Sequence, residues 1–270
     1  MTEIPAARLA DAARALMLAG RWAQATELLS AASATDNGER SILAVTAAEV
    51  AVDQDFWTRT DGGSSALDLA SAVGASVTGA SVTGAGHDLE FLRLKHDYNA
   101  VLFAGFGSGE RDPLVIAELA ERATRLRDAA PSGSQRAWAA FYVGLIADVL
   151  STDAPGDGGP AARAAYSQAH AVGAEAGDDL VVSYALRHLG YLDAQAGSVD
   201  AAKEQLSQSL ELRQRLGCVP HSLAQQLALA ELAHESGDVP WAQAVAGQVH
   251  AWASALPGDP WLVPASAEFL

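Results

Sequence analysis

Apolar residues recur at helical spacing along most of this chain, and short runs of glycine, proline and acidic residues separate them. The clearest case is the segment 183–217, in which one stripe of leucines precedes a Gly-Ser pair and a second stripe follows it. Apolar side chains three or four positions apart lie on one face of an α-helix. The segment therefore predicts two antiparallel helices joined by a tight turn at Gly197.

Small residues stand where the two predicted helices of this unit would touch, and the same spacing recurs elsewhere in the chain. In the segment 183–217 these residues are Gly190 and Ala202, with Gly197 in the turn. The equivalent residues are Ala230, Gly237 and Ala242 in a unit 40 residues later, and Ala13, Gly20 and Ala25 in a unit that opens the chain. A repeat of this kind predicts a solenoid in which each helical hairpin packs on the next.

These units resemble the tetratricopeptide repeat, a helix-turn-helix motif with a Leu-Gly pair, a turn glycine and alternating small and large positions on its second helix. The matching residues are Leu186, Leu189, Gly190, Gly197, Ala202 and Leu206, and in the first unit Gly20, Ala25, Leu29 and Ala32. The chain departs from the pattern at Asp193, Ser209 and Gln214, where an aromatic residue, an alanine and a proline are usual. The 40-residue interval also exceeds the usual length of about 34. Lengthened helices would explain it, and HEAT-like pairs are the alternative.

Helix-start signals divide the rest of the chain into further helices. Asp36 with Glu39 forms a capping box, Asp112 precedes a proline of the kind tolerated in a first helical turn, and Asp178 stands before another apolar stripe. The helices predicted between the repeat units span residues 41–57, 64–73, 88–104, 113–130, 136–150 and 160–176. We therefore predict an all-α fold, a right-handed α-solenoid of about six antiparallel helix pairs, which the resemblance implies is a TPR-like superhelix.

Two segments do not follow the repeat. The tandem sequence ASVTG-ASVTG at 75–84 alternates β-branched residues with glycine, a poor helix composition, and predicts an exposed, mobile loop. The tail contains Trp261 and Phe269 and is too apolar to extend freely into water, so it is expected to cover the last apolar face of the solenoid. The predicted domains are a TPR-like helical repeat domain at 1–255 and a C-terminal capping tail at 256–270.

The charge and composition of the chain narrow its function. Its 17 basic and 33 acidic residues give a net charge of −16, which opposes binding to nucleic acid phosphates. The single cysteine, Cys218, excludes an intrachain disulfide and a thiolate zinc site. The N-terminal residues lack the basic and apolar blocks of a secretory signal, and the uncharged stretch 69–86 is rich in glycine, serine and threonine. We therefore expect a cytoplasmic protein without nucleic acid or membrane partners.

A search for catalytic motifs finds none that is complete. The string GFGSGE at 105–110 resembles a nucleotide-binding loop, but no predicted strand precedes it. His234 and Glu235 begin like a metalloprotease helix, but Asp238 occupies the position of the second histidine. Glu49 and Asp53, four residues apart on a predicted helix, are read as a solvated face. The sequence therefore predicts no catalytic residue, no metal site and no cofactor.

The candidate binding surface is the concave face, which the family resemblance assigns to the first helix of each pair. One stripe of the helix around Leu189 carries Tyr184, Arg187 and Tyr191, separate from its packing residues. Extending this stripe to other helices gives the candidate groove residues Asp97, Trp138, Phe141, Asp148, Tyr184, Arg187, Tyr191, Glu231 and His234. Trp138 and Phe141 fit equally well as core residues, and His96 and His188 as hydrogen-bonded packing residues.

The sequence thus favours a non-catalytic binding module or scaffold that docks a peptide or partner protein in its concave groove. The alternative is a small-molecule sensor or an enzyme on the same solenoid, with His96 or His234 beside a carboxylate in a closed pocket. An enclosed apolar cavity would favour the alternative, and an open groove the module. A third reading is the sensor half of a regulator without its DNA-binding domain. A homo-oligomer is compatible with all three.

Overall fold

The computed structural model describes residues 4–75, 82–106, 111–153 and 158–270, which form thirteen α-helices and no strand. The helices are α1 (Ala6–Leu18), α2 (Trp22–Ser30), α3 (Asn37–Thr58), α4 (Gly63–Ala75), α5 (Val82–Phe106), α6 (Pro113–Asp128), α7 (Gly133–Asp153), α8 (Gly158–Ala176), α9 (Asp179–Gln195), α10 (Val199–Arg215), α11 (Val219–Glu235), α12 (Val239–Ala253) and α13 (Leu262–Ala267). None of these helices is both long enough and apolar enough to cross a membrane.

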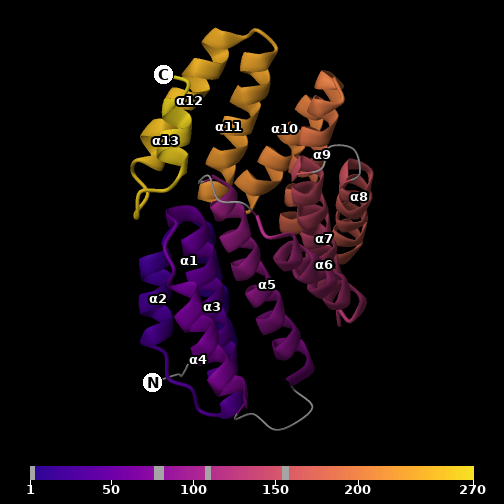
Figure 1. The fold of residues 1–270 in the computed structure, drawn as a ribbon. Coiled ribbons are helices and arrows are strands. Elements are labelled where there is room, and N and C mark those ends of the chain that lie inside the picture. Colours follow the sequence, from indigo (N-terminus) through magenta and orange to yellow (C-terminus); the bar gives the residue numbers. More distant parts are fainter. Residues whose placement is uncertain (1–3, 76–81, 107–110, 154–157) are drawn as a thin grey trace.

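Successive helices pack in pairs along the chain, α1 with α2 through α11 with α12 (Figure 1). Each pair also packs on the next, and the short α13 lies against α12 and α11. The predicted all-α solenoid of about six helix pairs is therefore confirmed, with α13 as an additional short helix.

The turns of the C-terminal half contain a glycine every 20 residues, at Gly177, Gly197, Gly217 and Gly237. All four have positive φ angles, between 69° and 90°. In the turn at Gly197, the backbone N–H of the next residue, Ser198, donates to the Asp193 carbonyl at 2.8 Å. This left-handed helix ending favours glycine because a Cβ atom would be strained there. Equal spacing gives α9, α10 and α11 the same length of 17 residues.

Small residues let the paired helices approach closely, as the repeat predicted. A Cβ atom on Gly190 of α9 would lie 2.9 Å from Leu206 Cγ and 3.3 Å from the Ala202 carbonyl oxygen, both on α10. Ala202 itself is fully buried. The equivalent alanines Ala13, Ala25, Ala230 and Ala242 are fully buried as well.

Side-chain caps start several helices where the sequence predicted. The Asp36 carboxylate accepts the Glu39 backbone N–H at 2.8 Å, and Asp112 accepts that of Leu114 at 2.9 Å. Asp178 likewise accepts the N–H of Val181 at 3.1 Å. Such caps satisfy N–H groups that have no partner within the helix.

Two predicted loops are shorter than the sequence suggested. The prediction of a loop at 75–84 is wrong at both ends, because α4 continues to Ala75 and α5 begins at Val82. The rest of that prediction, residues 76–81, lies outside the described residues. Similarly, α7 continues to Asp153 and α8 begins at Gly158. A single valine, threonine or glycine costs a helix only about 1 kcal/mol or less, so neighbouring helical turns override it.

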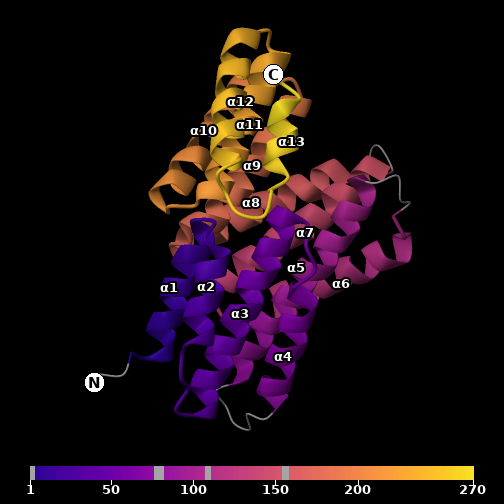
Figure 2. The same ribbon diagram turned by 90° about the vertical axis from the view of Figure 1, so that its left-hand side faces the viewer.

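The C-terminal segment returns to the N-terminal half of the molecule. The Trp261 backbone N–H donates to the Trp57 carbonyl at 3.1 Å, and the two indole rings stack with their centroids 5.7 Å apart. In Figure 2 the connection between α12 and α13 reaches the ends of the N-terminal helices. Residues of α1, α2, α3, α11 and α12 share one buried apolar cluster with Leu262. The superhelix is therefore closed on itself, first pairs against last.

The close approach at Gly190 predicts opposite effects for two glycine substitutions. Gly190→Ala should lower the free energy of unfolding by about 1–3 kcal/mol, because the added methyl group overlaps a packed neighbour. Gly86→Ala, in α5, should raise it by up to about 1 kcal/mol, because no described atom outside the surrounding helical turn lies within 4 Å of the new Cβ. Urea unfolding followed by circular dichroism measures both, and an unchanged midpoint for Gly190→Ala would contradict the tight crossing.

Candidate functional site

The first helices of four successive pairs, α3, α5, α7 and α9, surround a cavity of about 610 Å³. Trp261, Pro264 and Ala265 from the C-terminal segment close one side of it. Its aromatic lining consists of Phe56, Tyr98, Phe103, Phe141, Tyr142, Tyr184, Tyr191 and Trp261. The concave face of the superhelix is thus a partly enclosed cavity, which we call the main cavity.

Four of the predicted groove residues line the main cavity: Phe141, Tyr184, Arg187 and Tyr191. Arg187 donates to the Tyr191 hydroxyl at 2.7 Å, and its guanidinium carbon lies 5.0 Å from the centre of the Tyr191 ring. It also donates to the Ala224 carbonyl at 2.8 Å. Phe141 is 1 % exposed, so this residue belongs to the core and to the cavity wall at once.

Trp138, Asp97 and Asp148 lie elsewhere. Trp138 lines a second, smaller cavity of about 250 Å³, and its indole N–H donates to Asp178 at 3.0 Å. Asp97 forms an ion pair with Arg122 at 2.6 Å, between α5 and α6. Asp148 accepts from the Tyr166 hydroxyl at 3.3 Å, and burial raises the pKa of its carboxyl.

Glu231 and His234 also lie outside the lining of the main cavity. Burial raises the pKa of the half-buried Glu231 carboxyl, while the nearby Arg187 charge acts in the opposite direction. His234 is exposed, and its ring centre lies 5.8 Å from that of Phe269. The predicted stripe therefore follows the cavity in α9 and leaves it in α11.

Asp53 lies at the main cavity and not on the solvated face that the sequence predicted for it. It is 8 % exposed, and its Oδ2 accepts the indole N–H of Trp22 at 2.8 Å. Burial raises the pKa of this carboxyl to about 6, and the Lys95 charge opposes that rise. Its burial could have been predicted from its position on the same helical stripe as Val50 and Trp57, because a solvated carboxylate is expected on the opposite face. Its neighbour Glu49 instead pairs with Arg14 at 2.8 Å.

Lys95 and Asn99 of α5 also line the main cavity. Lys95 lines the smaller cavity too, as do Asp53 and Tyr184, so these three side chains stand between the two hollows. Among the described residues, Lys95 forms no hydrogen bond or ion pair, and the side chain of Asn99 forms no hydrogen bond. The concave face thus presents polar groups whose hydrogen-bonding capacity is not used by the part of the chain that the structure describes.

Two histidines, the half-buried His188 and the buried His221, adjoin these groups and are held neutral. Burial first, and then the charges of Arg187 and Arg213, lower the pKa of His188 to about 3. The same causes, burial first, lower the pKa of His221 well below its usual value. Arg213 is 2 % exposed, and its guanidinium carbon lies 4.8 Å from the centre of the Tyr184 ring. Because burial and the neighbouring arginines lower their pKa values, both histidines are poor bases.

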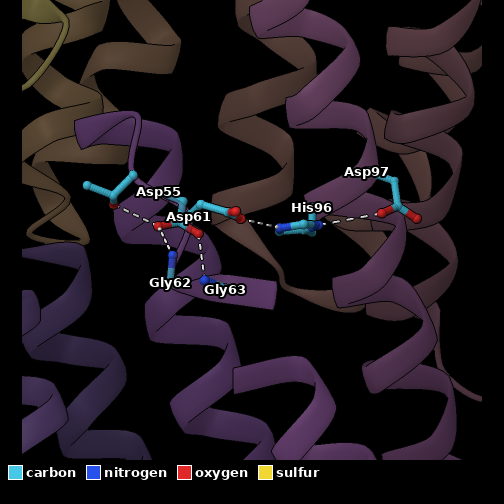
Figure 3. Close-up of polar contacts among 7 residues, drawn as sticks. Asp55, Asp61, Gly62, Gly63, His96 and Asp97 are labelled. Carbon is cyan, nitrogen blue, oxygen red and sulfur yellow. Dashed lines mark hydrogen bonds and ion pairs between the residues drawn. The ribbon is translucent and has the colours of Figure 1, made fainter. Parts of the chain in front are cut away.

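His96 belongs to a different cluster, with Asp55 and Asp61, at the start of α4 (Figure 3). One ligand atom from each lies within 4.8 Å of the others, a donor set that divalent cations accept. However, the Asp55 carboxylate already accepts the N–H groups of Gly62 and Gly63, at 2.9 and 2.6 Å. Both oxygens of Asp55 are therefore already occupied by backbone donors. We assign Asp55 to stabilising the turn between α3 and α4.

Comparison with known proteins gives no family. No family model and no curated protein matches the chain. Among solved structures, BtubC (BKLC) from P. vanneervenii is similar at 16% identity and a TM-score of 0.49, over 94% of this chain and 90% of that one. A Rap protein complexed with Competence and Sporulation Factor is 12% identical, with a TM-score of 0.49 over 98% and 80%. The apo form of RapI is 9% identical, with a TM-score of 0.45 over 98% and 79%.

At these identities and TM-scores, the similar structures give no information about ligands. The helical-repeat part of the predicted resemblance is confirmed by the six helix pairs of the structure. Membership of the tetratricopeptide family stays a prediction.

The buried Asp53 predicts a pH-dependent difference between the wild type and Asp53→Asn. A carboxyl with a pKa of about 6 when folded and 3.8 when unfolded stabilises the fold below pH 3.8 and loses this contribution as the pH rises through 6. At pH 7 the variant should therefore be more stable by up to about 3 kcal/mol, and the two proteins should converge near pH 4. Chemical unfolding at several pH values measures this.

Asp68→Asn, which replaces an exposed carboxylate on α4, is the matched control. Using the difference between two proteins removes the opposite contribution of His188 and His221, whose lowered pKa destabilises the fold in acid. A constant difference between wild type and Asp53→Asn from pH 4 to 7 would show that Asp53 ionises freely in the folded protein.

Proposed function

We propose that this protein is a non-catalytic binding module whose ligand occupies the main cavity on the concave face. The observation that carries this proposal is the cavity itself: about 610 Å³, with eight aromatic side chains and a few polar groups converging on it. Binding sites for organic ligands are hollows of about 300–1,000 Å³ with this kind of lining. Tyrosine and tryptophan provide contact area at little cost in rotamer entropy.

The size of the cavity favours a small organic molecule or a few peptide residues over a docked partner helix. Its volume of about 610 Å³ lies within the range of about 300–1,000 Å³ that is typical of sites for small organic ligands, and its aromatic lining encloses a compact body on several sides. A peptide or protein partner would insert a short extended segment of its chain into the cavity.

The alternative of an enzyme with a histidine and carboxylate pair finds little support in the arrangement. His96 and His234 do not line the cavity, and His188, which does, adjoins Arg187 and Arg213. A histidine with a pKa of about 3 is too weak a base for proton abstraction near neutral pH.

We propose further that residues 256–270 cover the cavity as well as the last hairpin. Trp261, Pro264, Ala265 and Glu268 all contribute to its lining. This segment packs on α12 and also contacts Trp57 of α3 through a hydrogen bond and an indole stack. It is therefore attached to both the last and the second helix pair.

Filling the cavity from this cover tests the proposal. Ala265→Trp places an indole toward the cavity, and Ala267→Trp places the same indole on the exposed side of α13. A thermal-shift screen with small organic metabolites and short peptides should find ligands that stabilise the wild type, by about 2.7 kcal/mol at a hundred times the dissociation constant.

Those ligands should stabilise Ala267→Trp equally and Ala265→Trp much less, with at least a tenfold loss of affinity by calorimetry. Equal stabilisation of both variants would place binding outside the main cavity. Failure of all small molecules and short peptides to stabilise the wild type would contradict the proposed function.

A further inference from the structure

The charges around the main cavity are opposite in sign to the chain as a whole. The chain carries −16, yet Arg59, Lys95 and Arg187 line the cavity against two carboxylates, Asp53 and Glu268. Glu268 is exposed, so Asp53 is the one buried carboxylate of the lining. Behind the lining, the buried Arg213 adds a further positive charge near Tyr184.

Lys95 is the clearest of these charges. Among the residues that the structure describes, no carboxylate oxygen lies within 4.0 Å of its ammonium group, and nothing accepts a hydrogen bond from it. Lysine is seldom buried without a partner, because removing its charge from water is costly. Its partial burial between the two cavities therefore leaves a cation with unused donors facing the hollow.

Asn99 and Arg187 add donors on the same wall. Asn99 lies one helical turn after Lys95, is 7 % exposed, and makes no side-chain hydrogen bond within the described ranges. Arg187 donates only to neutral acceptors, the Ala224 carbonyl, the Gln225 side chain and the Tyr191 hydroxyl. Glu231 acts on Arg187 only from beyond ion-pairing distance, so the guanidinium charge remains largely available to an anionic ligand.

We propose that the ligand of the main cavity is an organic anion with an apolar or aromatic body, its charged group held by Lys95, Asn99 and Arg187. This rests on the proposed function of the cavity and adds the chemical class of the ligand. The aromatic lining takes the body, and the amide and cationic donors take the anionic oxygens. Asp53 offsets part of the positive charge and disfavours a dianion over a monoanion.

A pair of fluorescent probes that differ in one charge tests the proposal. Anilinonaphthalene sulfonate carries an anionic group, and N-phenylnaphthylamine has the same rings without it. The wild type should bind both, and the sulfonate more tightly. Lys95→Met should weaken sulfonate binding about tenfold, the value of one charge-assisted hydrogen bond, and change binding of the neutral probe less than about twofold.

The ratio of the two affinities is the readout, because a general loosening of the cavity weakens both probes together. Lys203→Met, at the chain's other lysine, is the matched control and should keep the wild-type ratio. Lys95→Arg should restore most of it. An unchanged ratio in Lys95→Met, with the neutral probe still bound, overturns the anionic ligand but leaves the cavity as a binding site. Failure of both probes to bind the wild type overturns the proposed function itself.

Competition then identifies the source of the anion. Naphthaleneacetate should displace the sulfonate probe more strongly than naphthaleneacetamide, its neutral amide. A short apolar peptide with a free carboxyl terminus, compared with the same peptide amide, tests whether a peptide end supplies the charge. Equal displacement by each acid and its amide contradicts the proposal.

Discussion

The contact between Trp57 and Trp261 determines what kind of surface the helices present. Without it, a stack of helix pairs curls around an open hollow that is accessible along its whole length. The indole stack and the Trp261 to Trp57 backbone bond instead bring the C-terminal segment onto α3. Side chains from α3, α5, α7 and α9 then face the residues after Pro260 across a bounded volume. The aromatic lining, the half-buried lysine and the neutral histidines all follow from that enclosure, because each owes its character to exclusion from bulk water.

Local sequence patterns were sufficient for most of the helices, for the glycine turns and for the helix crossings. Glycine at Gly197 and Gly237, the Asp112 and Asp178 caps, and small residues such as Gly190 each act over a few residues, so their signals can be read from the chain. Closure could not be read in this way. It depends on a tryptophan pair separated by more than two hundred residues, and neither Trp57 nor Trp261 has a sequence pattern that names its partner.

The binding stripe was predicted on α9 and missed on α5 for a physical reason. In α9, Leu186 and Gly190 mark the packing side, so Tyr184, Arg187 and Tyr191 fall on the cavity side. Helix α5 has apolar residues around most of its circumference, which leaves its rotation undetermined by periodicity. The predicted groove residue of this helix, Asp97, pairs with Arg122, whereas the side chains that reach the cavity are Lys95 and Asn99. Asp53 was misplaced for a related reason, since an acidic residue on a helix is usually solvated.

Ring closure also limits how this molecule could change in evolution. An open array of hairpins gains or loses a unit with only local adjustment, because each unit touches its nearest neighbours. Here every pair contributes to a fixed circumference, and the first and last pairs share one apolar cluster with Leu262. Duplicating or deleting a hairpin would carry Trp261 away from Trp57 and uncover that cluster at both ends. The number of repeats is thereby as tightly constrained as any single core residue.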